Sequence, residues 1–164
     1  MPAALSLRPF EAGDLAALQR IRAAAFAAVF ASFRAIVGAE IAALALAAAE
    51  EDQARHLDEI CAPGSGHHVF VALASGEAAG FVSFTLDAAA RSGEIGLNAV
   101  HPDHAGRGIG TWMYGEALAR MKALGAAVAS VGTGGDASHA AARRAYQKAG
   151  FGPGIPSVHL YRLL

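Results

Sequence analysis

The sequence of 164 residues contains only one cysteine, Cys61, and few charged residues. A single thiol cannot form a disulfide within the chain, which is typical of proteins in a reducing cytoplasm. Charged side chains make up 16% of the residues and the formal net charge is −1. This composition gives no sign of the basic surface that binds nucleic acid. We therefore expect no nucleic-acid partner and, by default, a cytoplasmic location.

Long hydrophobic runs, targeting signals and metal-binding patterns are also missing. The N-terminal segment, MPAALSLRPF, lacks the charged start and apolar stretch of a signal peptide. The most apolar region, residues 35–49, is interrupted by Gly38 and Glu40 and is too short to span a bilayer, so we expect no membrane partner. The seven histidines show no metal-ligand spacing, and we expect no metal. The length predicts one domain over residues 1–164, which can fold without disulfides.

Hydrophobic periodicity and turn signals predict strands that alternate with helices. The expected strands cover residues 4–9, 68–73, 79–86, 94–100, 126–131 and 158–163, and the expected helices cover residues 15–37, 39–60, 107–124 and 137–149. The three strands between residues 68 and 100 are joined by short turns, which predicts an antiparallel meander. The 126–131 strand is almost wholly apolar, which predicts burial on both of its faces.

Residues 94–113 carry the strongest functional signal, because an expected strand leads through a polar turn into a glycine cluster that opens a helix. Free backbone N–H groups and the helix dipole make such a helix start an anion site, and glycine lets a phosphate approach closely. A P-loop would need lysine and then serine or threonine after a glycine, but Thr111 and Trp112 follow Gly110. A GxGxxG dinucleotide fingerprint would need glycine in place of Thr111. The spacing therefore indicates a phosphate ligand without identifying it.

Two motifs together resemble the GNAT superfamily of N-acetyltransferases. Residues 105–110, AGRGIG, are similar to its acetyl-CoA signature Gln/Arg-x-x-Gly-x-Gly/Ala, with Ala105 in place of glutamine or arginine. Residues 139–151, HAAARRAYQKAGF, resemble its later helix signature, with His139 in place of asparagine. The matching positions of the second motif are Ala142, Tyr146, Gly150 and Phe151. The resemblance implies an α/β (α+β) GNAT fold, with a mixed central sheet of about six or seven strands flanked by four helices, an antiparallel meander and one β-α-β coenzyme-binding unit.

The resemblance also implies an activity and a set of site residues. The implied enzyme moves an acetyl group from acetyl-CoA, its co-substrate, to a primary amine of a small molecule or peptide by direct attack in a ternary complex. Its implied coenzyme contacts are Ala99, Val100, Ala105, Gly106, Arg107, Gly108, Ile109, Gly110, Thr111, His139 and Tyr146. Its implied catalytic residues are Tyr146 near the coenzyme sulfur, Glu94 as a base, and Asn98.

Several alternatives remain open at this point. Tyr146 could be a packed helical side chain, and Glu94 a solvated carboxylate at a strand end. The need for a base depends on the acceptor, because freeing a lysine-type amine of pKa ~10.4 at pH 7 costs about 4.6 kcal/mol, whereas an α-amino group has a pKa of ~7.7–8.0. Asn98 shares the parity of Glu94 in a regular strand, but a bulge, which the resemblance implies, would break it.

Other functions and assemblies are also compatible with the sequence. A non-catalytic acyl-CoA-binding or sensing domain of the same fold is the alternative function, and Ala105 and His139 are departures that it could carry. An enzyme that acylates a hydroxyl is a third option. The apolar last strand could pair with a second subunit, which would make a homodimer.

Overall fold

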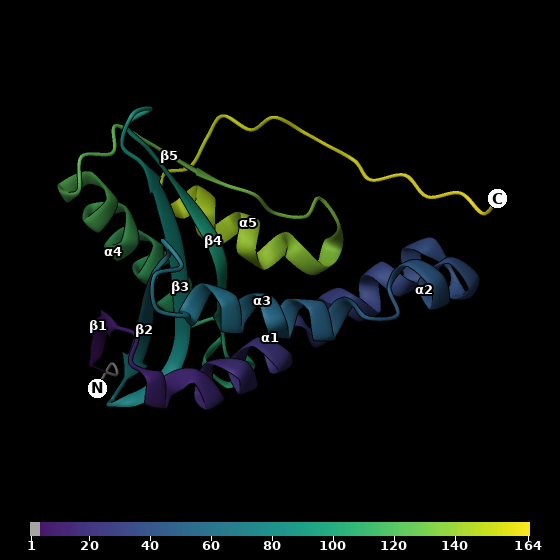
Figure 1. Ribbon diagram of the computed structural model, residues 1–164, viewed down its shortest axis with the longest axis horizontal. Coiled ribbons are helices and arrows are strands. Elements are labelled where there is room, and N and C mark those ends of the chain that lie inside the picture. The colour runs from purple at the N-terminus through teal and green to yellow at the C-terminus, as the bar shows by residue number, and fades with distance from the viewer. Residues whose placement is uncertain (1–3) are drawn as a thin grey trace.

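The computed structural model describes residues 4–164. The first three residues of the N-terminal segment, for which we expect no signal peptide, lie outside this range. One sheet lies between two layers of helices (Figure 1). Its strands are β1 (Leu5–Pro9), β2 (His68–Ala74), β3 (Glu77–Asp87), β4 (Ser92–Val100) and β5 (Val128–Val131). The helices are α1 (Leu15–Val37), α2 (Ala39–Ala45), α3 (Ala49–Cys61), α4 (Ile109–Ala123) and α5 (Ala140–Lys148).

The sheet follows the order of the chain, β1-β2-β3-β4-β5. Strands β1 to β4 are antiparallel to their neighbours, whereas β5 runs parallel to β4 after the crossover through α4. A parallel pair needs such a crossover, while short turns suffice for the antiparallel strands. The predicted meander and the mixed α/β sheet with one β-α-β unit are therefore confirmed.

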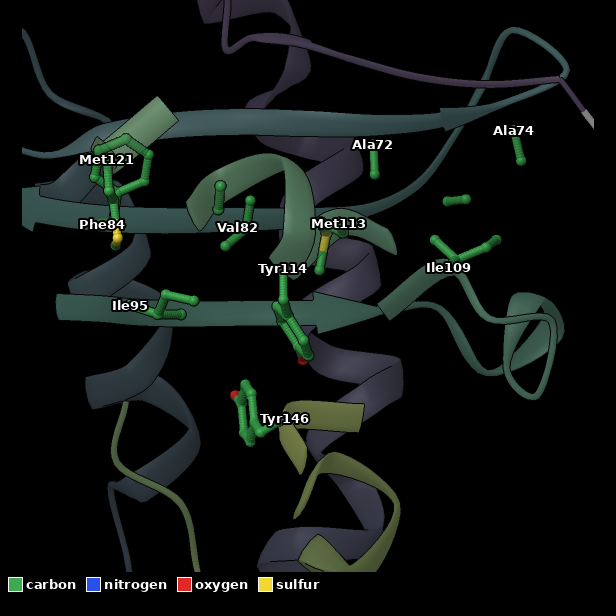
Figure 2. Packing of buried hydrophobic residues seen from close by; sticks show 12 residues of the cluster. Ala72, Ala74, Val82, Phe84, Ile95, Ile109, Met113, Tyr114, Met121 and Tyr146 are labelled. Atoms are coloured by element: carbon green, nitrogen blue, oxygen red, sulfur yellow. The ribbon is translucent and has the colours of Figure 1, made fainter. Parts of the chain in front are cut away.

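The two faces of the sheet carry separate apolar cores. On one face, Val82 and Phe84 of β3 pack with Met113 and Met121 of α4 and with Tyr146 of α5 (Figure 2). On the other face, side chains of α1 and α3 pack against β2 and β3, and this second core contains Leu18, Leu57, Val71 and Phe81. Alternation along β3 sends neighbouring side chains into opposite cores. The helix pairs therefore hold the sheet from both sides.

The helix that we predicted over residues 39–60 is divided into α2 and α3, so this expectation is wrong in detail. The Arg34 guanidinium donates to the carbonyl of Leu46, at 3.4 Å, and makes two bonds of 2.6 and 2.5 Å to the Glu50 carboxylate. These contacts hold the chain where it turns between the helices. Alanine favours a helix locally, but tertiary contacts override such a weak preference.

Two strand expectations also need correction. Residues 158–163 form no strand, and the sheet has five strands rather than six or seven over residues 4–164. A segment with β propensity becomes a strand only when another strand offers hydrogen bonds, and this segment lies against none. Strand β5 is not buried on both faces either, because it is the sheet edge and Val128 is 64% exposed. In residues 4–164 no helix combines the length and apolar character needed to cross a bilayer.

Two glycines should respond oppositely to alanine. A Cβ at Gly80 in β3 would lie 2.7 Å from the carbonyl oxygen of Ala99, whereas a Cβ at Gly115 in α4 would meet nothing within 4 Å. Gly80→Ala should lower the free energy of unfolding by about 1–3 kcal/mol through crowding. Gly115→Ala should raise it by about 0.5–1 kcal/mol, since glycine disfavours a helix. Urea unfolding measures both, and destabilisation of equal size in the two variants would contradict the assignment.

Candidate active site

The candidate site lies where β4 and β5 separate. The two strands pair from Ser92 opposite Val128 to Ile95 opposite Val131, and there the pairing ends. Strand β4 continues to Val100, while the chain after β5 leaves through the glycine-rich loop 132–136. The side of β4 that faces away from β3 therefore has no strand partner beyond Ile95. Unpaired N–H and C=O groups there are available to an extended ligand that carries amides.

A bulge in β4 lies at the same point. Val82 of β3 pairs with Asn98 and Phe84 pairs with Ile95, so Ser83 lies opposite both Gly96 and Leu97. The buried Ser83 hydroxyl donates to the Leu97 carbonyl at 2.9 Å. A Cβ at Gly96 would approach the Ser83 Oγ to 2.9 Å, which explains the glycine. The bulge that the resemblance implied is therefore present.

The bulge decides which β4 side chains share a face. Ile95 belongs to the core beneath α4 and α5, and Asn98 points to the same side, toward Tyr114 and Tyr146. Glu94 precedes Ile95 in a regular part of the strand, so its exposed side chain lies on the opposite face. The parity that joins Glu94 and Asn98 in a regular strand is thus broken. The two polar groups flank the end of the β4–β5 pairing from different sides.

Asn98 links two tyrosines that come from different helices. Its Nδ2 donates to the carbonyl of Gly96 at 2.9 Å and to the hydroxyl oxygen of Tyr146 at 3.0 Å. The Tyr114 hydroxyl donates to Asn98 Oδ1 at 2.8 Å. The Gly96 carbonyl can only accept, so it fixes the Asn98 amide with Nδ2 toward Gly96 and Oδ1 toward Tyr114. The Tyr114 hydroxyl is therefore the donor in its bond to Asn98. The rings of Tyr114 and Tyr146 stack with centroids 4.5 Å apart (Figure 2).

This arrangement leaves the Tyr146 proton available. The oxygen of Tyr146 accepts from Asn98, and its own path back to Asn98 Oδ1 is long, at 3.4 Å. The Tyr146 hydroxyl proton therefore has only this long contact, which a closer acceptor would replace. Burial, together with the neighbouring Tyr146, raises the pKa of Tyr114 far above its ordinary value, so Tyr114 remains a neutral donor. The buried position of Tyr146 is compatible with both the catalytic and the packing interpretation.

The glycine motif forms an exposed turn at the start of α4. A 3-10 turn, Pro102–His104, precedes it, and the exposed residues 105–108 lead into Ile109. Gly106 and Gly108 have φ of 74° and 77°, a left-handed conformation that other residues rarely adopt. The first α-helical hydrogen bond runs from Trp112 to the Gly108 carbonyl. The N–H groups of Ile109, Gly110 and Thr111 are therefore left outside the helix ladder, as an anion site requires.

His139 takes part in a different network. Its Nδ1 lies 2.7 Å from Asp136 Oδ1, and its ring stacks on Phe33 of α1. Asp136 also accepts from Ser138 and, at 2.7 Å, from Ser32 of α1. Hydrogen bonds from the Ser138 hydroxyl, and also from the Ser32 hydroxyl and the His139 imidazole, hold the pKa of the Asp136 carboxyl well below its ordinary value. This cluster, which we call the α1–α5 clasp, joins α1 to the start of α5.

In the part of the chain that the structure describes, neither a metal-binding cluster nor the thiol of Cys61 forms a second reactive centre. Among residues 4–164 no group of three or more histidine, cysteine, aspartate and glutamate side chains could hold a metal ion. Burial raises the pKa of the Cys61 thiol to about 11, so the thiol stays protonated near neutral pH. A protonated thiol is a poor nucleophile.

The sequence reasoning missed Tyr114, Asp136 and Ser32. Asp136 could have been recognised, because an aspartate before a helix is a common N-cap and its side chain accepts from the Ser138 N–H. Tyr114 carries no such signal, since its role depends on the bulge that turns Asn98 toward α4. Ser32 lies in the middle of a long helix, and only the packing of α1 against α5 reveals its partner.

Comparisons with known proteins identify the family and the fold. The model of the Acetyltransferase (GNAT) family matches residues 35–151. The curated proteins give no match. A protein assigned to the GNAT family from Desulfovibrio desulfuricans is 19% identical, with a TM-score of 0.69 over 93% of this chain and 87% of that chain.

Two further solved structures show the same similarity of fold. A GCN5-related N-acetyltransferase from Ralstonia eutropha JMP134 is 22% identical, with a TM-score of 0.65 over 96% of this chain and 99% of that chain. An aminoglycoside N-acetyltransferase in complex with CoA is 15% identical, with a TM-score of 0.64 over 99% of this chain and 97% of that chain.

The α1–α5 clasp should make stability depend on pH. Because the pKa of Asp136 is lowered by folding, its contribution is present above its unfolded pKa of about 3.9 and is lost as the pH falls toward the folded value. Asp136→Asn should lower the free energy of unfolding at pH 7 by on the order of 1 kcal/mol, as for one net hydrogen bond. The difference in the free energy of unfolding between wild type and Asp136→Asn should be smaller at pH 3 than at pH 7. Urea unfolding at both pH values measures it.

The matched control is Asp103→Asn, because the Asp103 side chain is 85% exposed. This variant should stay close to wild type at both pH values. A gap for Asp136→Asn that is the same at pH 7 and pH 3 would contradict the role of the ionised carboxylate.

Proposed function

The chain belongs to the GNAT family of acetyltransferases, and on this premise we propose that it transfers an acetyl group from acetyl-CoA to a primary amine of a small molecule or peptide, by direct attack in a ternary complex. One observation carries the proposal: Asn98 and Tyr146 hold a hydroxyl donor beside the point where β4 loses its pairing with β5. The single cysteine supports a cytoplasmic location for the enzyme.

The coenzyme would bind along two surfaces that fit its chemistry. Its pyrophosphate would lie on the backbone N–H groups of residues 105–111. The N–H groups of Ile109, Gly110 and Thr111 are free at the start of α4, whereas that of Ala105 already donates to the Pro102 carbonyl. Ala105 offers no side-chain contact, so backbone donors would carry this part of the binding. The amides of the pantetheine arm would pair with the free side of β4 near Ala99 and Val100, in the manner of an added strand. His139, at the N-cap of α5, would be a further contact of the coenzyme.

Acetyl-CoA supplies a thioester whose carbonyl carbon is attacked by the amine. A C–N bond forms, the C–S bond breaks, the amine loses a proton and the departing sulfur gains one. The Tyr146 hydroxyl would donate to that sulfur, and the hydrogen bond from Asn98 to the phenol oxygen strengthens the donor. Full transfer from a phenol of pKa ~10 to a thiolate of pKa ~8.5 is uphill by about 2 kcal/mol, which favours hydrogen-bond stabilisation of the sulfur. A backbone N–H in the bulge near Asn98 would stabilise the oxyanion.

Glu94 would serve as the base on the other face of the sheet. Its exposed carboxylate belongs to the last pairs of β4 with β5, one residue before the strands separate. An amine that approaches from the α1 side would meet this carboxylate directly or through water. The base matters for an acceptor with the pKa of lysine and is dispensable for one with the pKa of an α-amino group. The aminoglycoside N-acetyltransferase among the structural neighbours supports an amine acceptor.

The second candidate is a non-catalytic domain that binds or senses acyl-CoA. It is favoured by Ala105 and His139, which depart from the family motifs, and by the engagement of His139 with Asp136. Release of free thiol from acetyl-CoA across a panel of amines separates the two functions. An active enzyme releases thiol in proportion to acetylated amine, whereas a sensing domain binds acetyl-CoA and releases none.

The Tyr146→Phe variant should lower turnover more than it weakens coenzyme binding. Loss of the hydroxyl donor should reduce kcat by about 10²-fold, the usual size of an acid–base contribution, while the Kd for acetyl-CoA changes little. Tyr161→Phe is the control, since Tyr161 lies in the exposed C-terminal segment. Thiol release with the best acceptor of the panel gives kcat, and calorimetry gives Kd. Unchanged kcat would show that Tyr146 is a packing residue.

A bulky residue at Gly108 should abolish coenzyme binding. Gly108 has a φ of 77° at the start of α4, so valine would distort the turn and cover the N–H groups that face the phosphates. Gly115→Ala, in the same helix and exposed, should bind acetyl-CoA like the wild type. Calorimetry of both variants, with circular dichroism to verify folding, tests the site. A folded Gly108→Val protein with wild-type affinity would refute the phosphate assignment.

A further inference from the structure

Tyr114 of α4 carries a polar hydroxyl inside an apolar core. The residue is 5% exposed and belongs to the same buried cluster as Met113, Ala117 and Tyr146. Burial raises the pKa of its phenol far above the ordinary value, so the hydroxyl keeps its proton near neutral pH. A buried hydroxyl costs free energy unless it is hydrogen-bonded, whereas phenylalanine at this position would need no partner. The packing of the core therefore does not require this hydroxyl.

The Tyr114 hydroxyl completes the hydrogen bonds of the Asn98 amide. It donates to Asn98 Oδ1 at 2.8 Å. At the other end of the amide, Nδ2 donates to the Gly96 carbonyl at 2.9 Å and to the Tyr146 hydroxyl oxygen at 3.0 Å. An asparagine amide has two donor protons and one acceptor oxygen, so each polar group of this side chain is bonded. Tyr114 supplies the bond on the acceptor side.

The proton of Tyr146 competes for the same acceptor. The Tyr146 hydroxyl lies 3.4 Å from Asn98 Oδ1, which is longer than an ordinary O–H···O bond. If the Tyr114 hydroxyl were absent, Tyr146 would be the donor left to this buried oxygen among the contacts of residues 4–164. A buried acceptor without a donor costs free energy, so the Tyr146 hydroxyl would turn inward and shorten this contact. Its proton would then no longer be directed toward a ligand.

Stacking holds the ring of Tyr146 but does not orient its proton. The rings of Tyr114 and Tyr146 lie 4.5 Å apart with planes inclined by 29° (Figure 2). Phe151 also packs edge-on against Tyr146, with centroids 5.8 Å apart. A phenol proton still rotates about its C–O bond when the ring is fixed. The direction of the Tyr146 proton therefore depends on the hydrogen bonds of Asn98.

We propose that Tyr114 is a positioning residue for acetyl transfer, a role that rests on the proposed function. By donating to Asn98 Oδ1, Tyr114 keeps the Tyr146 proton directed toward the departing sulfur of the coenzyme. Tyr114 itself touches no reactant, because its side chain is enclosed in the core beneath α4 and α5. It acts through Asn98 on the hydroxyl that donates.

The first test removes the Tyr114 hydroxyl and retains the stacked ring. For Tyr114→Phe with the best acceptor of the amine panel, kcat should fall roughly tenfold, while the KM for the amine and the Kd for acetyl-CoA change by less than about twofold. The matched control is Met113→Leu, a volume-conserving change at the neighbouring buried position of α4, which should keep the wild-type kcat. Circular dichroism and urea unfolding verify that both variants fold.

A double-mutant cycle separates positioning from packing. If Tyr114 acts through the Tyr146 hydroxyl, Tyr114→Phe should change kcat by less than about twofold when Tyr146→Phe is already present. A packing role would lower kcat by the same factor in both backgrounds. Tyr114→p-aminophenylalanine, whose N–H group can donate to Asn98 Oδ1, should recover most of the activity that Tyr114→Phe loses.

The outcomes distinguish this role from the proposed function. An unchanged kcat in Tyr114→Phe, equal losses in both backgrounds, or no recovery with p-aminophenylalanine would overturn the role of Tyr114 and leave acetyl transfer intact. A Tyr114→Phe protein that does not fold would show that the hydroxyl is a structural group, which also overturns the role. If no amine of the panel elicits thiol release from the wild type, acetyl transfer itself fails, and this role fails with it.

Discussion

Ser83 of β3 lies opposite two residues of β4, Gly96 and Leu97, and this offset determines how the candidate site is assembled. It reverses the alternation of β4, so that Ile95 and Asn98 share a face although three positions separate them. Asn98 consequently reaches Tyr114 on α4 and Tyr146 on α5, and its amide orientation follows from the carbonyl of Gly96. Without the bulge, Asn98 would face α1, and the Tyr146 hydroxyl would lose this donor.

The same part of β4 separates two kinds of chemistry. A buried hydroxyl lies on the α5 face and an exposed carboxylate lies on the α1 face, while the backbone between them is free on one side. A thioester bound along that backbone would have a hydrogen-bond donor on one side and a base on the other. The α1–α5 clasp keeps the two helical layers in a defined relation, because Asp136 binds Ser32 from one layer and His139 from the other.

The edge of the sheet at β5 leaves apolar side chains exposed to solvent. Strand β5 is short and pairs with one neighbour, and apolar side chains of both β5 and the C-terminal segment face solvent. Neither of the two buried cores includes a residue of the C-terminal segment 152–164. The apolar side chains that remain at this edge and in the C-terminal segment, such as Val128 and Leu160, face solvent.

Local patterns in the sequence determined a large part of this protein. Alternation and turn residues located β1 to β4, Gly38 correctly ended α1, and the two motifs led to the GNAT family and to the α/β fold, both of which are confirmed. The positive φ of Gly106 and Gly108 likewise follows from residue type at a helix start. Such features depend on a few neighbouring residues, so the sequence alone suffices for them.

Only the tertiary structure decided the features that depend on distant partners. The break between α2 and α3 involves Arg34 and Glu50, and the face of Asn98 depends on the register of β4 against β3. The open edge of β5 follows from the absence of a sixth strand beside it in residues 4–164. The apolar composition of residues 126–131 predicted burial on both faces, and that of residues 158–163 predicted a strand. Whether an apolar segment is buried, however, depends on the surface that packs against it. The local sequence shows that the segment is apolar but does not specify that partner.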